Sequence, residues 1–201
     1  MRIAFVTSSR SDWALIAKVV EKAKEIFDVN LIVTGAHLSK HYGKTIKDVG
    51  LADDRIDILM LANSPLSTAT SIGLGVIKFA EVFARKKYDY VFLAGDRFEI
   101  LSAAIAAFTI KTKIIHYCGG EKTGTQDQAW RDMITAMAQY HLVQHELYKL
   151  NIFQKNPHAK IYTVGSTLAD NILEIKYDDE KEIKQKYGVG NISLLHIIQT
   201  H

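Results

Sequence analysis

The sequence predicts an α/β fold built on a doubly wound parallel β-sheet. Short apolar runs alternate along the chain with segments of helical periodicity, the run 90–94 is apolar throughout, and polar or glycine residues follow most of the runs. Strands that alternate with helices imply right-handed crossovers and parallel pairing. A continuous apolar run is typical of a strand covered on both faces, so we expect a Rossmann-like sheet between two helical layers.

In the first half of the chain we expect strands at 3–6, 29–33 and, more weakly, 57–61. Asp12 is a suitable cap for the first helix, because apolar residues recur after it at three- and four-residue spacing. The same spacing predicts a helix over 70–85.

In the second half we expect strands at 90–94, 113–117, 141–143 and 160–164, with helices over 100–110, 131–139 and 167–175. A charged stretch, 178–186, follows, and 192–195 resembles the first strand of a new sheet. A lone parallel strand needs neighbours to be buried. We therefore expect one domain over 1–175, with 176–201 as a linker and the stump of a second domain.

The composition excludes several classes of protein. A net charge of +3 gives no support for nucleic-acid binding. We find no signal peptide and no apolar run near the roughly 20 residues of a membrane span, so we expect a cytoplasmic protein without a membrane partner. The single cysteine, Cys118, allows no internal disulfide, fits a reducing compartment and is expected to be a small buried residue.

Motifs for common cofactors are absent from the sequence. There is no GxGxxG after the first strand, no GxxxxGK[ST], no HExxH and no histidine spacing typical of zinc. We therefore expect no cofactor and no metal.

Three acids are expected at one edge of the sheet. Asp96 follows the strand 90–94, Glu121 follows 113–117, and Asp127 lies shortly after Glu121. Ligands of such sheets bind outside the carboxyl ends of the strands. Crowded carboxylates have pKa values that are pushed apart, which suits a general acid and a general base. The structural alternatives are an N-cap for Asp96 and a surface salt bridge between Asp127 and Arg131.

Basic residues and glycines lie near the same strand ends. Arg10 is placed to meet a phosphate at a helix N-terminus, and Arg97 is either a phosphate ligand or a clamp on a neighbouring carboxylate. Gly120, in the pair 119–120, allows close approach of the backbone to a ligand. His37, in a loop after a strand, is the histidine best placed to touch a ligand. For His116 and His141, a role in the core and a role in the site are both open.

These motifs together resemble the hydrolysing UDP-N-acetylglucosamine 2-epimerases of sialic and related nonulosonic acid biosynthesis. The resemblance rests on residues in order from 1 to about 175: Val6-Thr7-Ser8-Ser9-Arg10-Ser11-Asp12-Trp13, Val33-Thr34-Gly35-Ala36-His37-Leu38, Tyr42-Gly43-Lys44-Thr45, Gly95-Asp96-Arg97-Phe98-Glu99, Gly119-Gly120-Glu121-Lys122-Thr123-Gly124, Asp127, Arg131 and Val164-Gly165-Ser166.

The resemblance implies the N-terminal half of a GT-B-like two-domain fold, with a UDP-sugar in the cleft and homo-oligomeric assembly. It implies elimination of UDP to give 2-acetamidoglucal, then hydration to N-acetylmannosamine. Asp96, Glu121 and Asp127 would be the acid and base residues. Arg10, His37, Arg97, Gly120, Arg131, His116, His141 and His196 would contact the substrate or position its neighbours.

The sequence departs from the family at three places. Members usually have histidine at 132 and often a second acid at 128, where this chain has Asp132 and Gln128. His196 approaches the His-Pro motif that opens the family's nucleotide-binding domain, but 197–201 do not continue it. A shifted reading frame is one hypothesis for this end. For the 201-residue chain itself we expect low or no activity. The alternatives to an epimerase are a truncated, inactive remnant and a GT-B-type glycosyltransferase domain.

Overall fold

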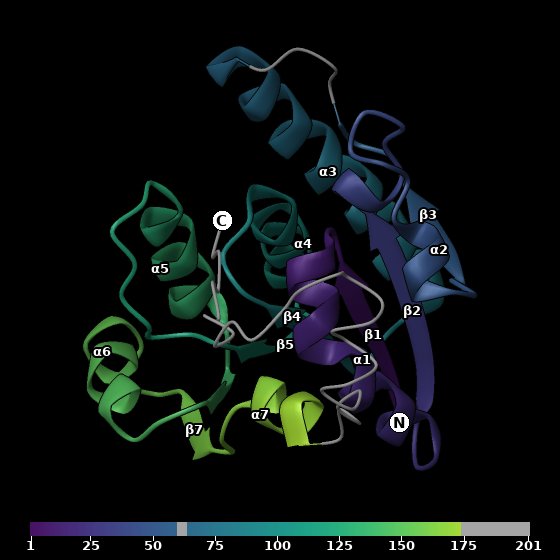
Figure 1. Cartoon of the computed structure of the whole chain (residues 1–201). Helices are drawn as coiled ribbons and strands as arrows, with labels where there is room; N and C mark the ends of the chain where they lie inside the picture. The colour runs from purple at the N-terminus through teal and green to yellow at the C-terminus, as the bar shows by residue number, and fades with distance from the viewer. Residues whose placement is uncertain (60–63, 174–201) are drawn as a thin grey trace, which may run out of the picture. The chain divides into compact units, whose positions relative to one another are not determined.

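The computed structural model describes residues 1–59 and 64–173, and it contains a seven-stranded parallel sheet in the order β3-β2-β1-β4-β5-β6-β7 (Figure 1). The expected doubly wound α/β fold is confirmed. The strands are β1 Arg2–Thr7, β2 Asp28–Thr34, β3 Asp54–Ile56, β4 Tyr90–Ala94, β5 Lys113–Tyr117, β6 Tyr140–Val143 and β7 Lys160–Thr163. The helices are α1 Arg10–Lys24, η1 Gly35–His37, α2 Ile46–Val49, α3 Pro65–Lys86, α4 Phe98–Thr109, α5 Asp127–Met137, α6 Leu147–Lys155 and α7 Thr167–Leu173.

The first strand lies in the interior of the sheet, between β2 and β4. Ile3 of β1 is in register with Val29 of β2 on one side and with Tyr90 of β4 on the other. The strand order therefore reverses between β1 and β4, and sheets of this kind bind ligands where the order reverses.

Alternate residues of the central strands pack into two separate cores, one on each face of the sheet. Ala4 and Val6 of β1 lie in the core that includes α3, α4 and α5, whereas Ile3 and Phe5 lie in the core that includes α1 and α2 (Figure 1). Because neighbouring side chains of a strand point to opposite faces, both sets must be apolar. This explains the continuous apolar runs in the sequence.

Two expectations about element boundaries are wrong. The third strand is β3, which ends just before the run expected at 57–61; residues 57–59 of this run belong to no strand, and 60–61 lie outside the described residues. Ile58 is nevertheless 1% exposed, so its apolar character reflects core packing and not strand pairing. The N-cap of α1 is Ser9, and Asp12 lies inside the helix, where its carboxylate accepts hydrogen bonds from the backbone N–H groups of Ser8 and Ser9, both at 2.6 Å.

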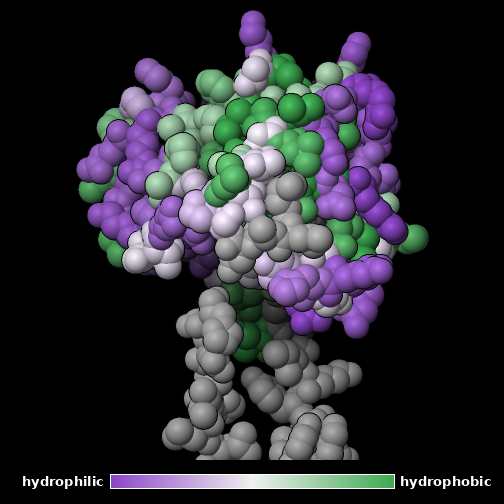
Figure 2. Space-filling view, turned by 90° about the horizontal axis from the view of Figure 1, so that it is seen from above, coloured by the Kyte–Doolittle hydropathy of each residue, from purple (hydrophilic) through white to green (hydrophobic). Residues whose placement is uncertain are grey.

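Helix α3, with 22 residues, is longer than expected, because the sequence predicted no apolar segment near the length of a membrane span. Among the described residues it is the one helix that is long and apolar enough to cross a membrane, by length and composition only. Core helices of soluble proteins meet the same two criteria. Phe79 and Phe83 of α3 are fully buried in the core, while Leu66 and Ile77 are exposed. Figure 2 shows hydrophobic side chains gathered over part of the face seen from above, with hydrophilic ones at its margins.

The chain divides into a compact unit over Met1–Leu168 and a second unit from Ala169 onward. The expected boundary at 175, the expected strand at 192–195 and His196 lie outside the described residues.

Candidate active site

A cleft of about 260 Å³ opens at the carboxyl ends of β4 and β5, beside the start of α1 and next to the point between β1 and β4 where the strand order reverses. We call it the β4–β5 cleft. It brings together residues that are far apart in the sequence. Its lining consists of Ser11, Asp12, Leu15, Ala94, Gly95, Asp96, Arg97, Cys118, Glu121, Arg131, Gln144 and Leu168.

Arg131 joins the two strand ends that border this cleft. Its Nη1 donates to Glu121 Oε2 at 2.8 Å and to the carbonyl of Cys118 at 3.1 Å, and its Nη2 donates to the carboxylate of Asp96. The Arg131 side chain is 6% exposed, and the side chains of Asp96 and Glu121 are 19% and 22% exposed. One guanidinium thus holds two carboxylates beside each other, although Asp96 and Glu121 follow different strands.

The carboxylates of Asp96 and Glu121 stabilise the charged form of Arg131. Burial opposes the charge of Arg131, but the hydrogen bonds and negative charges of Asp96 and Glu121 raise its pKa above the ordinary value. Glu121 Oε1 is buried and has no hydrogen-bond partner among the described residues. The Cys118 thiol is close enough to this carboxylate to interact with it.

Asp127 is the third acid, at the first turn of α5. Partial burial, followed by the negative charge of Asp96, raises the pKa of Asp127. The surface salt bridge between Asp127 and Arg131, an alternative from the sequence, does not form in the described part of the chain, because Arg131 turns beneath α5 toward Asp96 and Glu121. Asp127 is not among the residues that line the β4–β5 cleft, although the charge of Asp96 acts on it, so its place with the other two acids stays a prediction.

The segment 118–121 carries Glu121 to the cleft through an unusual backbone path. Cys118 and Gly120 both have positive φ, 65° and 77°. A Cβ at Gly120 would lie 2.5 Å from the carbonyl oxygen of Tyr148, so only glycine fits against α6 here. The Asn151 side chain donates to the Gly120 carbonyl at 2.7 Å, which fastens the same turn to α6.

Arg97 holds a neighbouring carboxylate, which was one of its two expected roles. Its Nη2 donates to Glu99 Oε1 at 3.0 Å, and its Nε donates to Oε2 at 3.2 Å. The Glu99 side chain is fully buried, and burial raises its pKa although Arg97 opposes this shift. A Cβ at Gly35 would lie 2.8 Å from Glu99 Oε1, so Glu99 also packs against the turn after β2. The sequence predicted no separate role for Glu99.

Arg10 and His37 have quite different surroundings. Arg10, the first residue of α1, is exposed and its Nε pairs with Asp48 at 2.8 Å. His37 is fully buried, and its ring nitrogens are hydrogen bonded to Thr7 Oγ1 at 3.1 Å and Thr45 Oγ1 at 2.7 Å. Burial lowers the pKa of His37. Neither residue lines the β4–β5 cleft, and contact with a substrate stays a prediction for both.

His116 and His141 lie side by side on β5 and β6, with ring centroids 5.6 Å apart. Both are fully buried, and burial lowers the pKa to about 3 for His116 and about 4 for His141. His116 Nε2 donates to the Gly95 carbonyl at 2.9 Å, which ties β5 to the residue before Asp96. A Cβ at Gly119 would lie 2.8 Å from Nδ1 of each ring, so the two imidazoles leave too little room for a side chain at this position.

Cys118 is buried, as expected, and its sulfur accepts a hydrogen bond from Gln144 at 3.1 Å. Burial, followed by the charge of Glu121, raises the pKa of the thiol to about 12. A thiol of this kind is not a nucleophile at neutral pH.

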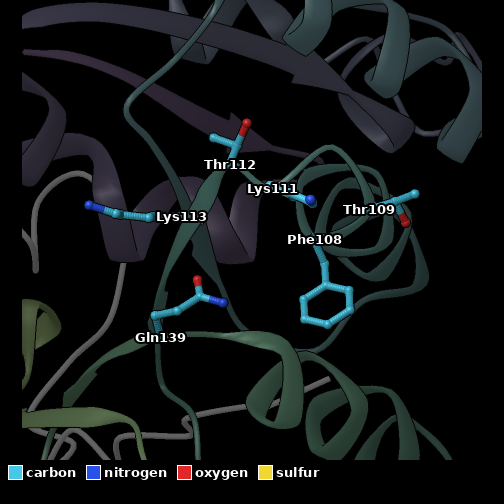
Figure 3. Close-up of a pocket in the computed structure, with 6 residues that line it drawn as sticks. All are labelled: Phe108, Thr109, Lys111, Thr112, Lys113 and Gln139. Carbon is cyan, nitrogen blue, oxygen red and sulfur yellow. The ribbon is translucent and has the colours of Figure 1, made fainter.

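A larger hollow of about 600 Å³ lies at the opposite edge of the sheet, where β5 begins (Figure 3). Its lining residues are Phe108, Thr109, Lys111, Thr112, Lys113 and Gln139. Its lining contains no acid and no histidine, whereas Asp12, Asp96 and Glu121 line the smaller β4–β5 cleft. No group of three or more His, Cys, Asp or Glu in residues 1–59 and 64–173 is arranged to hold a metal ion.

Comparison with known families gives a match to the model of UDP-N-acetylglucosamine 2-epimerase over residues 20–196. Among curated proteins, the chain is 34% identical over 194 residues to a UDP-N,N'-diacetylbacillosamine 2-epimerase (hydrolyzing) of Legionella pneumophila, covering 93% of this chain and 52% of that protein. It is 30% identical to the GDP/UDP-N,N'-diacetylbacillosamine 2-epimerase (hydrolyzing) of Campylobacter jejuni, covering 100% of this chain and 54% of that protein. The chain thus spans about half the length of the curated relatives it matches.

Solved structures show the same fold. The UDP-GlcNAc 2-epimerase of Neisseria meningitidis, bound to UDP-GlcNAc, superposes with a TM-score of 0.77 at 20% identity, covering 94% of this chain and 53% of that one. The enzyme of Methanocaldococcus jannaschii, in complex with UDP-GlcNAc and UDP, gives a TM-score of 0.76 at 19% identity, covering 87% of this chain and 49% of that one. The expectation of the N-terminal half of a GT-B-like fold is confirmed.

Proposed function

The chain belongs to the UDP-N-acetylglucosamine 2-epimerase family, and we propose that its β4–β5 cleft performs the acid–base chemistry of a hydrolysing epimerase that converts UDP-N-acetylglucosamine to N-acetylmannosamine and UDP. The observation that carries the proposal is the bridge from Arg131 to Asp96 and Glu121. It holds two carboxylates at the border of a cleft that lies next to the reversal point of the sheet.

The proposed reaction has two steps. A carboxylate removes the proton from C2 of the sugar, the electron pair forms a C1–C2 double bond, and the C1–oxygen bond to UDP breaks. Water then adds to the resulting 2-acetamidoglucal, with hydroxyl at C1 and a proton at C2 from the opposite face. Both steps need a base and an acid at neighbouring positions.

The three acids suit different parts of this reaction. Arg131 holds one oxygen of Glu121 and the carboxylate of Asp96 at the cleft. The raised pKa of Asp127 favours retention of a proton relative to an ordinary aspartate. This arrangement supports carboxylates that accept a proton beside an acid that supplies one, with Arg10 and Arg97 as proposed positioning residues for phosphate.

Two nucleotide sugars should be compared as substrates. The relatives of Legionella pneumophila and Campylobacter jejuni are named for UDP-N,N'-diacetylbacillosamine, whereas the matching family is named for UDP-N-acetylglucosamine. We propose the latter, and the ratio of kcat/KM for the two sugars decides between them. A cytoplasmic location and homo-oligomeric assembly stay predictions.

The test is turnover in D2O by the protein with UDP-N-acetylglucosamine. We expect UDP release together with N-acetylmannosamine that carries deuterium at C2, because the C2 proton exchanges during elimination and hydration. Glu121→Gln and Asp96→Asn should each lower kcat at least a hundredfold, the lower end of a general acid–base contribution, while Asp57→Asn, an exposed acid outside the cleft, should not. UDP release without deuterium at C2, or full activity in Glu121→Gln, would contradict the proposal. Transfer of the sugar to an added acceptor would favour a glycosyltransferase.

A further inference from the structure

A second hollow, of about 240 Å³, lies behind the turn that carries Glu121, and α5 and α6 line it. We call it the α5–α6 hollow. Glu121 lines both this hollow and the β4–β5 cleft. Arg131 holds the side chain of Glu121 on the side of the cleft. The backbone of Glu121 is held on the other side, where the α5–α6 hollow lies.

Gln128, in the first turn of α5, makes hydrogen bonds to both ends of this turn. Its Nε2 donates to the backbone carbonyl of Glu121 at 3.3 Å, and its Oε1 accepts from the backbone N–H of Thr123 at 2.7 Å. The side-chain amide thus satisfies one acceptor and one donor two residues apart, as a neighbouring strand would do. The turn that follows Glu121 is thereby fastened to α5.

Asp132 determines which way the Gln128 amide points. Its Oδ1 accepts from Gln128 Nε2 at 2.8 Å, and its Oδ2 pairs with Lys155 of α6 at 3.2 Å. A carboxylate only accepts hydrogen bonds, so it selects the amide orientation in which nitrogen faces Asp132 and oxygen faces Thr123. The ion pair with Lys155 also holds this carboxylate in place.

We infer that Gln128, oriented by Asp132, is a positioning residue that holds the backbone of Glu121 at the cleft. Two of the positions at which the resemblance leads us to expect a departure from the family, 128 and 132, are therefore partners of each other in this chain. The catalytic meaning of this inference rests on the proposed function, whereas the fastening of the turn can be measured without any activity.

The substitution Gln128→Glu tests the donating half of the amide. It keeps the size and one accepting oxygen, but it places a second carboxylate oxygen against the Glu121 carbonyl and against Asp132. We expect repulsion to move the side chain out of the turn, so the hydrogen-exchange protection of the Thr123 amide should fall about tenfold at pH 7, as for the loss of one or two hydrogen bonds. The matched control is Gln154→Glu, which makes the same change of charge in the α5–α6 hollow at an exposed residue and should leave Thr123 unchanged.

A second variant separates positioning from a general loss of structure. In Gln128→Glu combined with Asp132→Asn, the new amide can donate to the new carboxylate, so the repulsion from position 132 is removed and only the contact with the Glu121 carbonyl stays unfavourable. We expect Thr123 protection to return to within about threefold of the parent value. Protonation offers a second rescue, because a neutral glutamic acid again has a donor. Protection in the single variant, corrected for intrinsic exchange rates, should therefore recover as the pH falls from 7 toward 4.

Turnover is measured on the same four proteins. We expect kcat to fall in Gln128→Glu with little change in KM, to recover in the double variant, and to be unaffected by Gln154→Glu. Unchanged Thr123 protection in Gln128→Glu, or no recovery in the double variant, would overturn the fastening of the turn. Lost protection with unchanged kcat would overturn the link to Glu121. An inactive parent protein would count against the proposed function alone, because the exchange measurements still test the turn.

Discussion

The guanidinium of Arg131 and the carboxylate of Glu121 form an ion pair of 2.8 Å in which the arginine side chain is almost completely buried. The same arginine reaches the Asp96 carboxylate, so the pair belongs to a group of three charges that have left most of their water. Such a group is stable only while all its members are present.

Removal of this arginine should therefore destabilise the protein. Arg131→Met keeps much of the side-chain volume but leaves two mostly buried carboxylates unpaired, so we expect the free energy of unfolding to fall by about 3 kcal/mol. Urea denaturation followed by circular dichroism measures this. Arg131→Lys should fall between the parent and Arg131→Met, because an ammonium cannot present the planar fork that meets both acids. A loss below about 1 kcal/mol in Arg131→Met would show that the group contributes little to stability.

A methyl group at Gly120 should also be costly. Gly120→Ala places a Cβ 2.5 Å from the Tyr148 carbonyl oxygen at a φ of 77°, so we expect a loss of about 2 kcal/mol or more in the free energy of unfolding. Gly124→Ala is the matched control, since Gly124 lies in the same loop with nothing within 4 Å of a new Cβ and no positive φ. Its effect should stay within about 0.5 kcal/mol. Equal effects of the two changes would contradict the packing of this turn against α6.

The histidine pair should make the fold sensitive to acid. The pKa values of His116 and His141 are lowered by burial to about 3 and about 4, whereas an unfolded histidine has a pKa of about 6.5. Between these values the unfolded chain binds protons that the folded protein does not. The free energy of unfolding should therefore fall as the pH decreases from 6.5 toward 4, by up to about 1.4 kcal/mol per pH unit for each histidine.

The variant His141→Leu measures this contribution directly. Between pH 6 and 4.5 we expect its unfolding free energy to depend less on pH than that of the parent, by about 1 kcal/mol per pH unit. His158→Leu replaces an exposed histidine and should retain the slope of the parent. The same slope in all three proteins would mean that His141 is protonated in the folded state.

Asp96 should influence the titration of Asp127 through space. Partial burial and the charge of Asp96 raise the pKa of Asp127. Removal of that charge in Asp96→Asn should lower the pKa of Asp127, since the repulsion between two carboxylates disappears. Carboxyl carbon chemical shifts, recorded against pH, report this, and Asp57→Asn provides a control at an exposed acid of another segment. A rise in the pKa of Asp127 in Asp96→Asn would show that loss of the Arg131 contact dominates instead.

Much of the sheet could be predicted from the sequence, because strands buried on both faces are apolar at every position. The strands 90–94 and 113–117 were predicted with the bounds that the structure shows for β4 and β5. The edge strand β3 was misplaced, since Asp54 and Arg55 face solvent or other charges and give no apolar signal. Helix α6 was missed for a related reason: only Ile152 is buried along its length, so no apolar stripe marks it.

For the site, the order of strand ends predicted that Asp96 and Glu121 would lie at one edge. The partner of Arg131 was not predictable in this way, because spacing along α5 points to Asp127, whereas the tertiary fold turns the guanidinium toward two strands. The buried Glu99 was missed because a glutamate next to an arginine on a helix usually signals solvent. Its burial follows only from the packing of α4 against the turn after β2.

The position of β1 between β2 and β4 also determines when its two edges can be paired during synthesis. The first strand to leave the ribosome can pair early with β2, but its other edge stays open until β4 has been made. At translation rates of about 5–20 residues per second, the roughly 80 residues that separate β1 from β4 take about 4–16 seconds. For that interval the nascent chain presents an apolar, unpaired strand edge. This is the period in which assistance by a chaperone would matter most for this protein.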